Sequence, residues 1–562
     1  MVDWQNVTNW DPSILDTVLN NLIAERKKCY TSGESIQDID KDVTWSGEGA
    51  TAASSALGQL EDKTAGLLAD FGKLIGSTEQ TVEGVKEVKT AVTEAISLAD
   101  AYGFTIAADG SKVEAAEDDP TVQGKLSECS ELVAKALRKA EEVDASYAAA
   151  LAEVTHDQVP VTESLGDVTP GLPDGPPDGA ASEQVAEWWS RLAEGERQKY
   201  VDRFTSPEAL NDADTREQAR KLGNLNGIES WARDKVNRSL LEWDIEDAKH
   251  RKDVVSGSGG PGEEDTAASQ ERRDRINFLN HRLQELEKLR GQLGVEEGKP
   301  PKQLLLYDPA TGEKGHENLH AAVSYGDVDK AKHVSTVVPG MTTTVDSLVE
   351  PAVRDMGNLH RVASEKAGGD PVALVTWMGY DAPGYPVIQD GAEVFGPEKA
   401  QMGGDRLVGF VEGIDASHKS EGHNLHQSVL GHSYGSTTSS HAMTKVKPGV
   451  VDDFAMYGSP GAQGCGAAYN VPEGHTYAMR YQTDFVGAGR VTPAFNGLGE
   501  DPMNDPNIKH LDPGHSPTEE RSLDIFGMKF PLDFGAATHT EYMNDGTQSQ
   551  DQLANVVVGK AG

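Results

Sequence analysis

Hydrophobic residues recur at helical spacing along the N-terminal part of the chain. Ile14, Val18 and Leu22 stand four residues apart, and the polar stretch TSGES follows them. A longer run of the same spacing covers 50–101, and an Ala-, Glu- and Lys-rich segment covers about 121–154. Apolar residues three or four positions apart line one face of a helix. The pattern therefore predicts an all-α hairpin or bundle over residues 1–154.

Two stretches are too rich in Pro, Gly and Ser to sustain a helix or a strand. The first, VTPGLPDGPPDGAAS, closes a predicted linker over 155–182, and the second is SGSGGPGEED. Between and after them, residues 183–300 are predicted to be helical and to lead into the next domain. A heptad rhythm near the end of this region predicts a short helical hairpin or a coiled-coil arm. It consists of Ile276, Leu279, Leu283, Leu286 and Leu293, interrupted at Arg290. Three heptads favour packing within the chain over dimerisation.

From about residue 302 the pattern changes to strand, turn and helix. Short apolar runs ending in Gly or Pro recur, among them QLLLYDP, AAVSYGD, VALVTWMGYDAP, SVLGHSYG, DDFAMYGSPG and TYAMRYQTDFVG. Strands that alternate with helices form a mostly parallel sheet covered on both faces. We therefore expect an α/β domain over 301–562.

Composition narrows the possible partners. The 562 residues include 51 Lys and Arg against 91 Asp and Glu, a formal charge of −40, which argues against nucleic acid. No run of 18 apolar residues predicts a membrane span, and the N-terminus lacks the pattern of an ordinary signal peptide. We expect a protein that is cytoplasmic, or secreted by another route, and not integral to a membrane.

Cysteine usage excludes a disulfide scaffold and a zinc pattern. The sequence has Cys29, Cys129 and Cys465, and a bridge between the first two stays open beside buried free thiols. No His, Asp and Glu set has metal-ligand spacing, so we expect neither a metal nor another cofactor.

One short motif carries candidate chemistry. GHSYG, residues 431–435, fits the G-x-S-x-G pattern of a sharp strand-to-helix turn that exposes a nucleophilic serine. Gly431 and Gly435 lack the Cβ atoms that would clash where strand and helix crowd together. Ser433 is therefore the predicted nucleophile, and the backbone N–H of Tyr434 is a predicted donor to an oxyanion.

A serine nucleophile on this kind of sheet needs an acid and then a histidine later in the chain. Asp484 ends the apparent strand HTYAMRYQTD, and His539 lies in GAATHTEYM, so these two are predicted to complete a triad with Ser433. The alternatives are Asp501, Asp505 and Asp512 for the acid, and His510 and His515 for the base.

The second oxyanion donor should come from the loop after an earlier strand. VVPGMTTT offers the N–H of Met341, with Gly340 allowing close approach, and MGYDAP at 378–383 is the rival segment. Four aromatic residues admit two interpretations, an apolar pocket wall or ordinary core: Trp377, Tyr380, Phe395 and Phe410.

Several motifs together resemble an actinobacterial α/β-hydrolase family catalogued as a domain of unknown function. They are LGNLNGI…RDKVNR, VPGM, GYDAP, GHSYGS, GSPG and HTEYM, and the resemblance covers about 185–550. It implies an α/β-hydrolase fold with a Ser-Asp-His triad, often preceded by helical modules, and it implies no substrate.

The N-terminal hairpin resembles the small W-x-G proteins exported by type VII secretion systems. Trp45 and Gly47 stand at the turn in TWSGEGATAA, followed by small residues. The family's export signal, a Tyr with an acid four residues later, is not met by Tyr102, which has Ile106 at that offset. The resemblance implies a type VII partner for the hairpin; the other interpretation is an ordinary helical bundle.

These observations favour a serine hydrolase that cleaves an ester, less readily an amide, of a small or lipid-like molecule through an acyl-enzyme. The alternative is a secreted, non-catalytic interaction protein that uses the hairpin and keeps the hydrolase domain as a scaffold.

Overall fold

The structure is a computed structural model of the chain. It describes residues 3–41, 47–115, 122–156, 175–176, 179–257, 267–310, 318–340, 351–383, 397–464, 466–484, 497–518, 523–525, 528–530 and 536–561. The chain forms two compact units, Met1–Gly175 with Arg191–Glu196, and Pro176–Ser190 with Arg197–Gly562.

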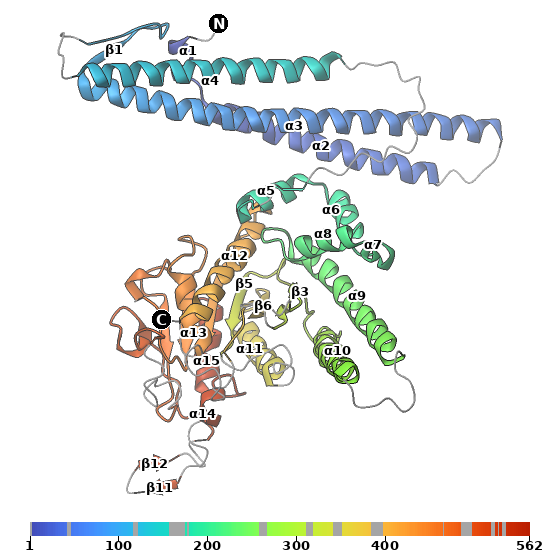
Figure 1. The fold of residues 1–562 in the computed structure, drawn as a ribbon, viewed down its shortest axis with the longest axis vertical. Helices are drawn as coiled ribbons and strands as arrows, with labels where there is room; N and C mark the ends of the chain where they lie inside the picture. Colours follow the sequence, from blue (N-terminus) through green and yellow to red (C-terminus); the bar gives the residue numbers. More distant parts are fainter. Residues whose placement is uncertain are drawn as a thin grey trace. The chain divides into compact units, whose positions relative to one another are not determined.

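The first unit is built on long helices (Figure 1). They are α1 (Trp4–Thr8), α2 (Pro12–Lys41), α3 (Glu48–Tyr102) and α4 (Gln123–His156), with a small antiparallel pair of strands, β1 (Phe104–Ile106) and β2 (Val113–Ala115). The long helix expected over 50–101 is α3, and it packs against both α2 and α4. It ends at Gly103, whose φ of 69° is the left-handed conformation that glycine supplies at helix ends.

The core of this unit joins the second half of α3 to α4. Val88 and Ala95 on α3 and Cys129 and Ala136 on α4 are fully buried. Cys129 is a free thiol that contacts the Ala95 carbonyl oxygen at 3.5 Å. Cys29 is also free, so the two cysteines are not bridged; Cys465 lies outside the described residues.

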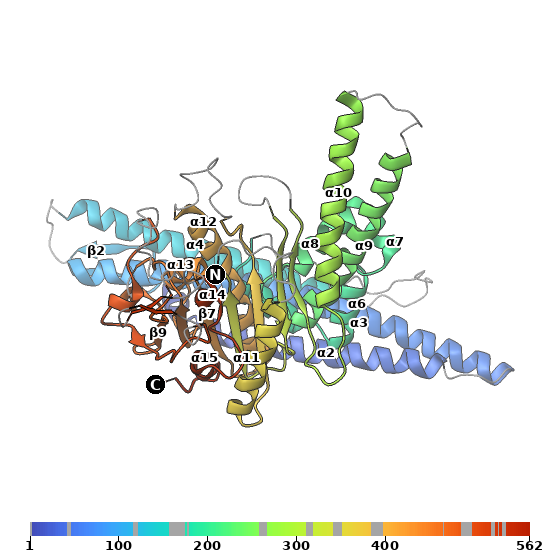
Figure 2. The same ribbon diagram turned by 90° about the horizontal axis from the view of Figure 1, so that it is seen from below.

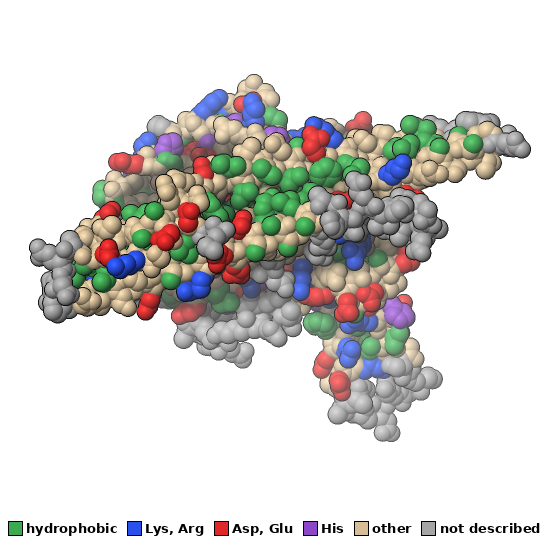
Figure 3. Space-filling model, turned by 90° about the horizontal axis from the view of Figure 1, so that it is seen from above, with side chains coloured by type: hydrophobic (Ala, Val, Ile, Leu, Met, Phe, Trp, Pro, Cys, Tyr) green, Lys and Arg blue, Asp and Glu red, His purple; other side chains and the backbone are tan. Residues whose placement is uncertain are grey.

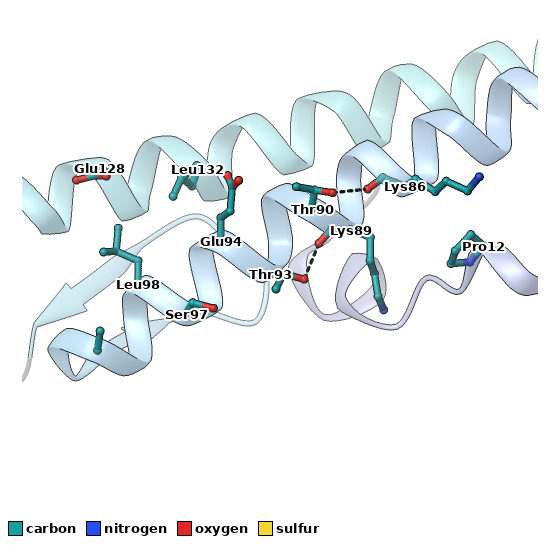
Figure 4. Close-up of a pocket in the computed structure, with 11 residues that line it drawn as sticks. Pro12, Lys86, Lys89, Thr90, Thr93, Glu94, Ser97, Leu98, Glu128 and Leu132 are labelled. Carbon is teal, nitrogen blue, oxygen red and sulfur yellow. Dashed lines mark hydrogen bonds between the residues drawn. The ribbon is translucent and has the colours of Figure 1, made fainter. Parts of the chain in front are cut away.

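The first unit also exposes apolar surface. Figure 3 shows hydrophobic side chains gathered along the long helices. A groove of about 830 Å³ is lined by residues of α3, α4 and the start of α2 (Figure 4), including Leu98, Leu132, Lys86 and Glu94. No helix of the described residues combines the length and apolar character that crossing a membrane requires.

The second unit has a mostly parallel sheet, as the sequence predicts. Its strands are β3 (Leu304–Asp308), β4 (His320–Tyr325), β5 (His333–Val338), β6 (Val372–Met378), β7 (His426–His432), β8 (Asp453–Tyr457), β9 (Thr476–Met479) and β10 (Lys509–His510). Among the described residues the order is β10-β9-β8-β7-β5-β6-β4-β3, with β4 antiparallel to both its neighbours and the other pairs parallel.

Helices cover both faces of this sheet. The core of one face includes residues of α12 (Glu398–Ser420) and α13 (Tyr434–Met443). The core of the other includes residues of α11 (Pro351–Ala367) and α15 (Gln548–Val557). A short helix, α14 (Ala536–Thr540), precedes α15, and β11 (Leu523–Ile525) pairs separately with β12 (Met528–Phe530). The predicted α/β architecture, a parallel sheet between two helical layers, is confirmed.

Six further helices lie between the predicted linker and the sheet along the chain. They are α5 (Ser182–Arg191), α6 (Glu194–Asp202), α7 (Pro207–Asn211), α8 (Ala213–Gly223), α9 (Ser230–Gly257) and α10 (Ala267–Gln292) among the described residues. Figures 1 and 2 show α9 and α10 side by side, so the predicted intramolecular hairpin is confirmed. Where Arg290 interrupts the heptads, Leu289 one position earlier is fully buried and fills the gap.

Side chains from α8 and α9 occupy the outer edge of the sheet. Strand β3 would leave backbone groups unpaired there, because it has one neighbour, β4. The Asp234 carboxylate accepts from the Leu304 N–H at 2.6 Å, and the Asn237 amide donates to the Leu304 carbonyl at 3.0 Å. The helices thus close this edge with side-chain hydrogen bonds rather than another strand.

The start of α9 is tied to the sheet as well. The Asp329 carboxylate accepts from the Ser230 and Trp231 N–H groups at 2.6 and 2.8 Å, two donors that a helix N-terminus leaves unpaired. Burial raises the pKa of Asp329 to about 6. The helices α8 and α9 therefore belong to the same folded body as the sheet.

Candidate active site

Ser433 occupies a strained turn at the carboxyl end of the central strand β7. Its φ of 52° and ψ of −130° make it the one non-glycine residue with positive φ in the described part of the chain. Helix α13 begins at the next residue, Tyr434. The turn is held by the Ser433 N–H, which donates to the Tyr457 carbonyl at 3.0 Å. A serine is kept in this conformation only when its surroundings impose it.

The neighbouring glycines leave no room for side chains. A Cβ on Gly431 would lie 2.6 Å from the Ser436 Cα, and one on Gly435 would lie 2.2 Å from the Val338 carbonyl oxygen. A Cβ on Gly340 would lie 2.6 Å from the Ser433 Cβ. Strand β7, helix α13 and the end of β5 therefore approach each other to a distance that only glycine permits.

Asp484 and His539 are paired directly. The His539 Nδ1 lies 2.9 Å from Asp484 Oδ1 and 3.0 Å from Oδ2. Asp484 follows the end of β9 and is 1% exposed, whereas His539 lies in α14 and is 9% exposed. Because an ionised carboxylate only accepts, Nδ1 carries the proton and leaves Nε2 as the acceptor. This is the tautomer that a general base requires.

His432 links the serine turn to this pair. Its Nε2 donates to the His539 carbonyl at 2.8 Å, and its ring lies 4.8 Å from the His539 ring and 4.9 Å from that of Tyr457. Burial, with a smaller effect of the neighbouring His539, lowers the pKa of His432 to about 3. His432 is therefore a neutral hydrogen-bond donor.

The three predicted residues thus gather at one edge of the sheet. A Cβ on Gly458, directly after β8, would lie 3.1 Å from both Asp484 Oδ2 and His539 Cε1. The hydrogen bonds of the described residues do not include one between Ser433 Oγ and His539. Such contacts are often loose before substrate binds.

The alternative acids form hydrogen bonds away from Ser433, and the alternative bases are exposed. Asp501 is paired with Arg480 at 3.0 Å, Asp505 accepts from the Gly466 N–H at 2.6 Å, and Asp512 accepts from the Gly514 N–H at 3.0 Å. His510 and His515 are exposed side chains. None of these contacts joins the residue to Ser433, His432 or His539.

The structure describes one of the two predicted oxyanion donors. Tyr434 is buried at the start of α13, and Met341 lies outside the described residues. In the rival segment, Asp381 accepts from the backbone and side-chain amides of Asn318 at 2.9 and 3.1 Å. That carboxylate holds a neighbouring loop.

The candidate aromatic wall belongs to the core. Trp377, Tyr380 and Phe410 are 1–3% exposed and lie in the core of one sheet face, while Phe395 lies outside the described residues. The Tyr380 ring stacks on that of Tyr434 at 6.5 Å, and its hydroxyl donates to the Pro339 carbonyl at 2.8 Å. Tyr380 thus packs against Tyr434, the residue that follows Ser433.

Two residues at this edge were not singled out from the sequence, although both lie in quoted motifs. They are His432, in GHSYG, and Tyr542, in HTEYM, whose hydroxyl donates to Asp484 Oδ2 at 2.6 Å. Their partners come from distant segments, so spacing alone could not reveal them.

In the part of the chain that the structure describes, no group of three His, Cys, Asp or Glu could hold a metal ion.

Comparisons with known proteins find relatives of this chain. Residues 314–494 match the sequence model of a family described as alpha/beta hydrolase. The Mycobacterium tuberculosis (strain H37Rv) protein Rv0963c is 32% identical over 238 residues, which cover 41% of this chain and 83% of that protein.

Two further comparisons cover smaller shares of the other protein. Rv2079 of the same strain is 28% identical over 358 residues, 59% of this chain and 50% of that protein, so this chain spans about half of that relative's length. The solved structure of an alpha-amino acid ester hydrolase overlaps 30% of this chain and 26% of its own, at 12% identity and a TM-score of 0.17.

Proposed function

Because the chain belongs to the α/β-hydrolase family, we propose that it is a serine hydrolase that cleaves an ester, or less readily an amide, through an acyl-enzyme. The observation that carries the proposal is the positive φ of Ser433 at the β7–α13 turn, beside the hydrogen-bonded His539–Asp484 pair. A serine in such a turn has its hydroxyl clear of the sheet.

In the proposed reaction, Ser433 Oγ attacks the substrate carbonyl carbon while His539 Nε2 takes its proton. The backbone N–H groups of Tyr434 and Met341 would stabilise the oxyanion of the tetrahedral intermediate. His539 then protonates the leaving alcohol, and water, activated by the same imidazole, hydrolyses the acyl-enzyme. Asp484 orients the imidazole and stabilises its protonated form.

A fluorophosphonate probe tests the proposal without knowledge of the substrate. Its phosphorus is attacked by an activated serine, which forms a Ser–O–P bond and expels fluoride. We expect stoichiometric labelling at Ser433, located by peptide mass spectrometry, with Ser436→Ala still labelled. Acyl esters of graded chain length would then separate small from lipid-like substrates. Absence of labelling, or labelling at another residue, would refute Ser433 as the nucleophile.

We propose a second role, protein interaction, for the helical unit. Its apolar surface and groove support this role, because exposed apolar patches of this kind mark interaction sites. Trp45, at the W-x-G turn, lies outside the described residues. If the unit directs type VII export, deleting residues 1–181 should abolish appearance of the protein in the culture medium of an actinobacterial host. Equal export of both forms would exclude the role.

A further inference from the structure

The Asp484 carboxylate has a second side-chain donor besides His539. The Tyr542 hydroxyl lies 2.6 Å from Asp484 Oδ2, a short contact of the kind that a charged acceptor produces. Both residues are 1% exposed. A phenol so placed loses its hydration and needs this partner in return.

The direction of this hydrogen bond is fixed by the surroundings of the phenol. The Tyr481 N–H lies 3.1 Å from the Tyr542 oxygen and can only donate, so the hydroxyl proton is left for the carboxylate. Burial, together with the adjacent Asp484, raises the pKa of Tyr542 well above its ordinary value. The hydroxyl therefore stays protonated, and remains a donor, throughout the working range of an enzyme.

The same short segment supplies both donors. His539 and Tyr542 are three residues apart, and they contact Asp484 through Nδ1 and the phenol oxygen respectively. The segment is anchored at each end of this pair. His432 donates to the His539 carbonyl at 2.8 Å, and the Ser549 hydroxyl donates to the Tyr542 carbonyl at 2.8 Å.

We propose that Tyr542 is a positioning residue: its hydroxyl holds the Asp484 carboxylate in the orientation from which that carboxylate orients the His539 imidazole. The inference rests on the proposed serine-hydrolase function, which it deepens by adding a fourth residue to the site. It requires no contact between Tyr542 and the substrate.

Loss of the hydroxyl has two consequences. The carboxylate becomes free to rotate away from the His539 Nδ1, which lowers the fraction of correctly oriented base. The carboxylate also keeps more negative charge on the oxygens that face the imidazole, which favours the protonated, inactive imidazolium. The titratable group that contacts Asp484 besides Tyr542 is His539. The rings of His432, Tyr457 and Tyr481 contact His539 or Tyr542 instead.

Labelling kinetics of the full chain test the proposal. Tyr542→Phe keeps the ring, which stacks on Tyr481 at 4.5 Å, and removes only the oxygen. We expect the second-order rate constant of fluorophosphonate labelling at pH 7 to fall about tenfold or more, as for a lost hydrogen bond to a charged group. The acid limb of the rate–pH profile should move to higher pH.

The matched control is Tyr481→Phe. It deletes a hydroxyl from the same aromatic cluster, one that lies 2.6 Å from the Ser549 hydroxyl. We expect its labelling rate to stay within about twofold of the parent, with an unmoved acid limb. In an Asp484→Asn background, Tyr542→Phe should have little further effect, because the hydroxyl acts through the carboxylate.

The outcomes are distinct. Unchanged labelling by Tyr542→Phe, or an equal loss in both Tyr→Phe variants with no pH shift, would overturn the positioning role and leave the hydrolase intact. Failure of the parent protein to label at Ser433 would overturn both proposals.

If Tyr542→Phe does not fold, proton NMR tests the contact instead. The Tyr542 hydroxyl proton should give a downfield resonance in the parent that moves upfield in Asp484→Asn. An unmoved resonance in Asp484→Asn would refute the contact between Tyr542 and Asp484.

Discussion

The side chain of Asn224 pairs with the backbone of Tyr307 as a neighbouring strand would. Its oxygen accepts from the Tyr307 N–H at 2.9 Å, and its amide nitrogen donates to the Tyr307 carbonyl at 2.9 Å. Both groups belong to β3, at the edge of the sheet. The Asn224 amide thus replaces the missing strand at this residue.

Removing this amide should weaken the fold. Asn224→Ala leaves two buried backbone groups of β3 without partners, so we expect the free energy of unfolding to fall by about 2–3 kcal/mol. Urea unfolding followed by circular dichroism measures the change. The control, Asn507→Ala, removes an exposed amide and should cost less than about 0.5 kcal/mol. Equal midpoints for the two variants would show that the Tyr307 backbone has other partners.

We expect the labelling activity to require the helices α8 and α9 but not residues 1–181. We expect a chain of residues 182–562 to be soluble and labelled by the fluorophosphonate at the full-length rate. A chain of residues 301–562 loses every side chain that closes β3 and should aggregate through that edge. Size-exclusion chromatography and labelling check both. A soluble, labelled 301–562 chain would show that the sheet needs no helical support.

The proposed triad members should fail in different ways. Ser433→Ala removes the nucleophile, so labelling should vanish and turnover fall about 10⁶-fold. His539→Ala should cost nearly as much, and Asp484→Asn roughly 10⁴-fold, because the imidazole survives in the wrong tautomer. A Ser433→Ala, His539→Ala double variant should be hardly worse than Ser433→Ala. Near-normal turnover in Asp484→Asn would move the acid to Asp501, Asp505 or Asp512.

His432 should make the fold sensitive to acid. In the folded chain its pKa is about 3, whereas an unfolded histidine takes up a proton near pH 6.5. Between these values the unfolded state binds more protons, so stability falls as the pH drops below about 6.5. We expect the stability advantage of the parent over His432→Phe to shrink by at most about 1.4 kcal/mol per pH unit from pH 6.5 to 4.5. Urea unfolding at several pH values measures it; a constant difference would contradict the neutral state of His432.

The features that sequence reasoning predicted are local or periodic. The turn at Ser433 is predicted by five consecutive residues, GHSYG, and Gly431 serves a close approach to Ser436 in the helix that follows directly. The layered sheet follows from alternating apolar runs, and Asp484 from its place after one of them. Such patterns need no knowledge of which segments meet in space.

The rest depends on contacts between distant segments. Tyr542 meets Asp484 across 58 residues, and Asn224 meets Tyr307 across 83. The antiparallel direction of β4 is set by its pairing with β3 and β6 rather than by its composition. The motifs LGNLNGI and RDKVNR suggested a family, but only the structure shows that their polar side chains close a sheet edge.

The chain order of the site has a consequence for biosynthesis. A ribosome completes β7 and the Ser433 turn well before it adds α14, which carries His539, and α15, which packs into the core of one sheet face. Domains fold as units once their segments have emerged. The nascent chain therefore passes through a stage in which the serine is present without its proposed base. In the proposed mechanism the serine therefore becomes reactive only after the later helices have docked.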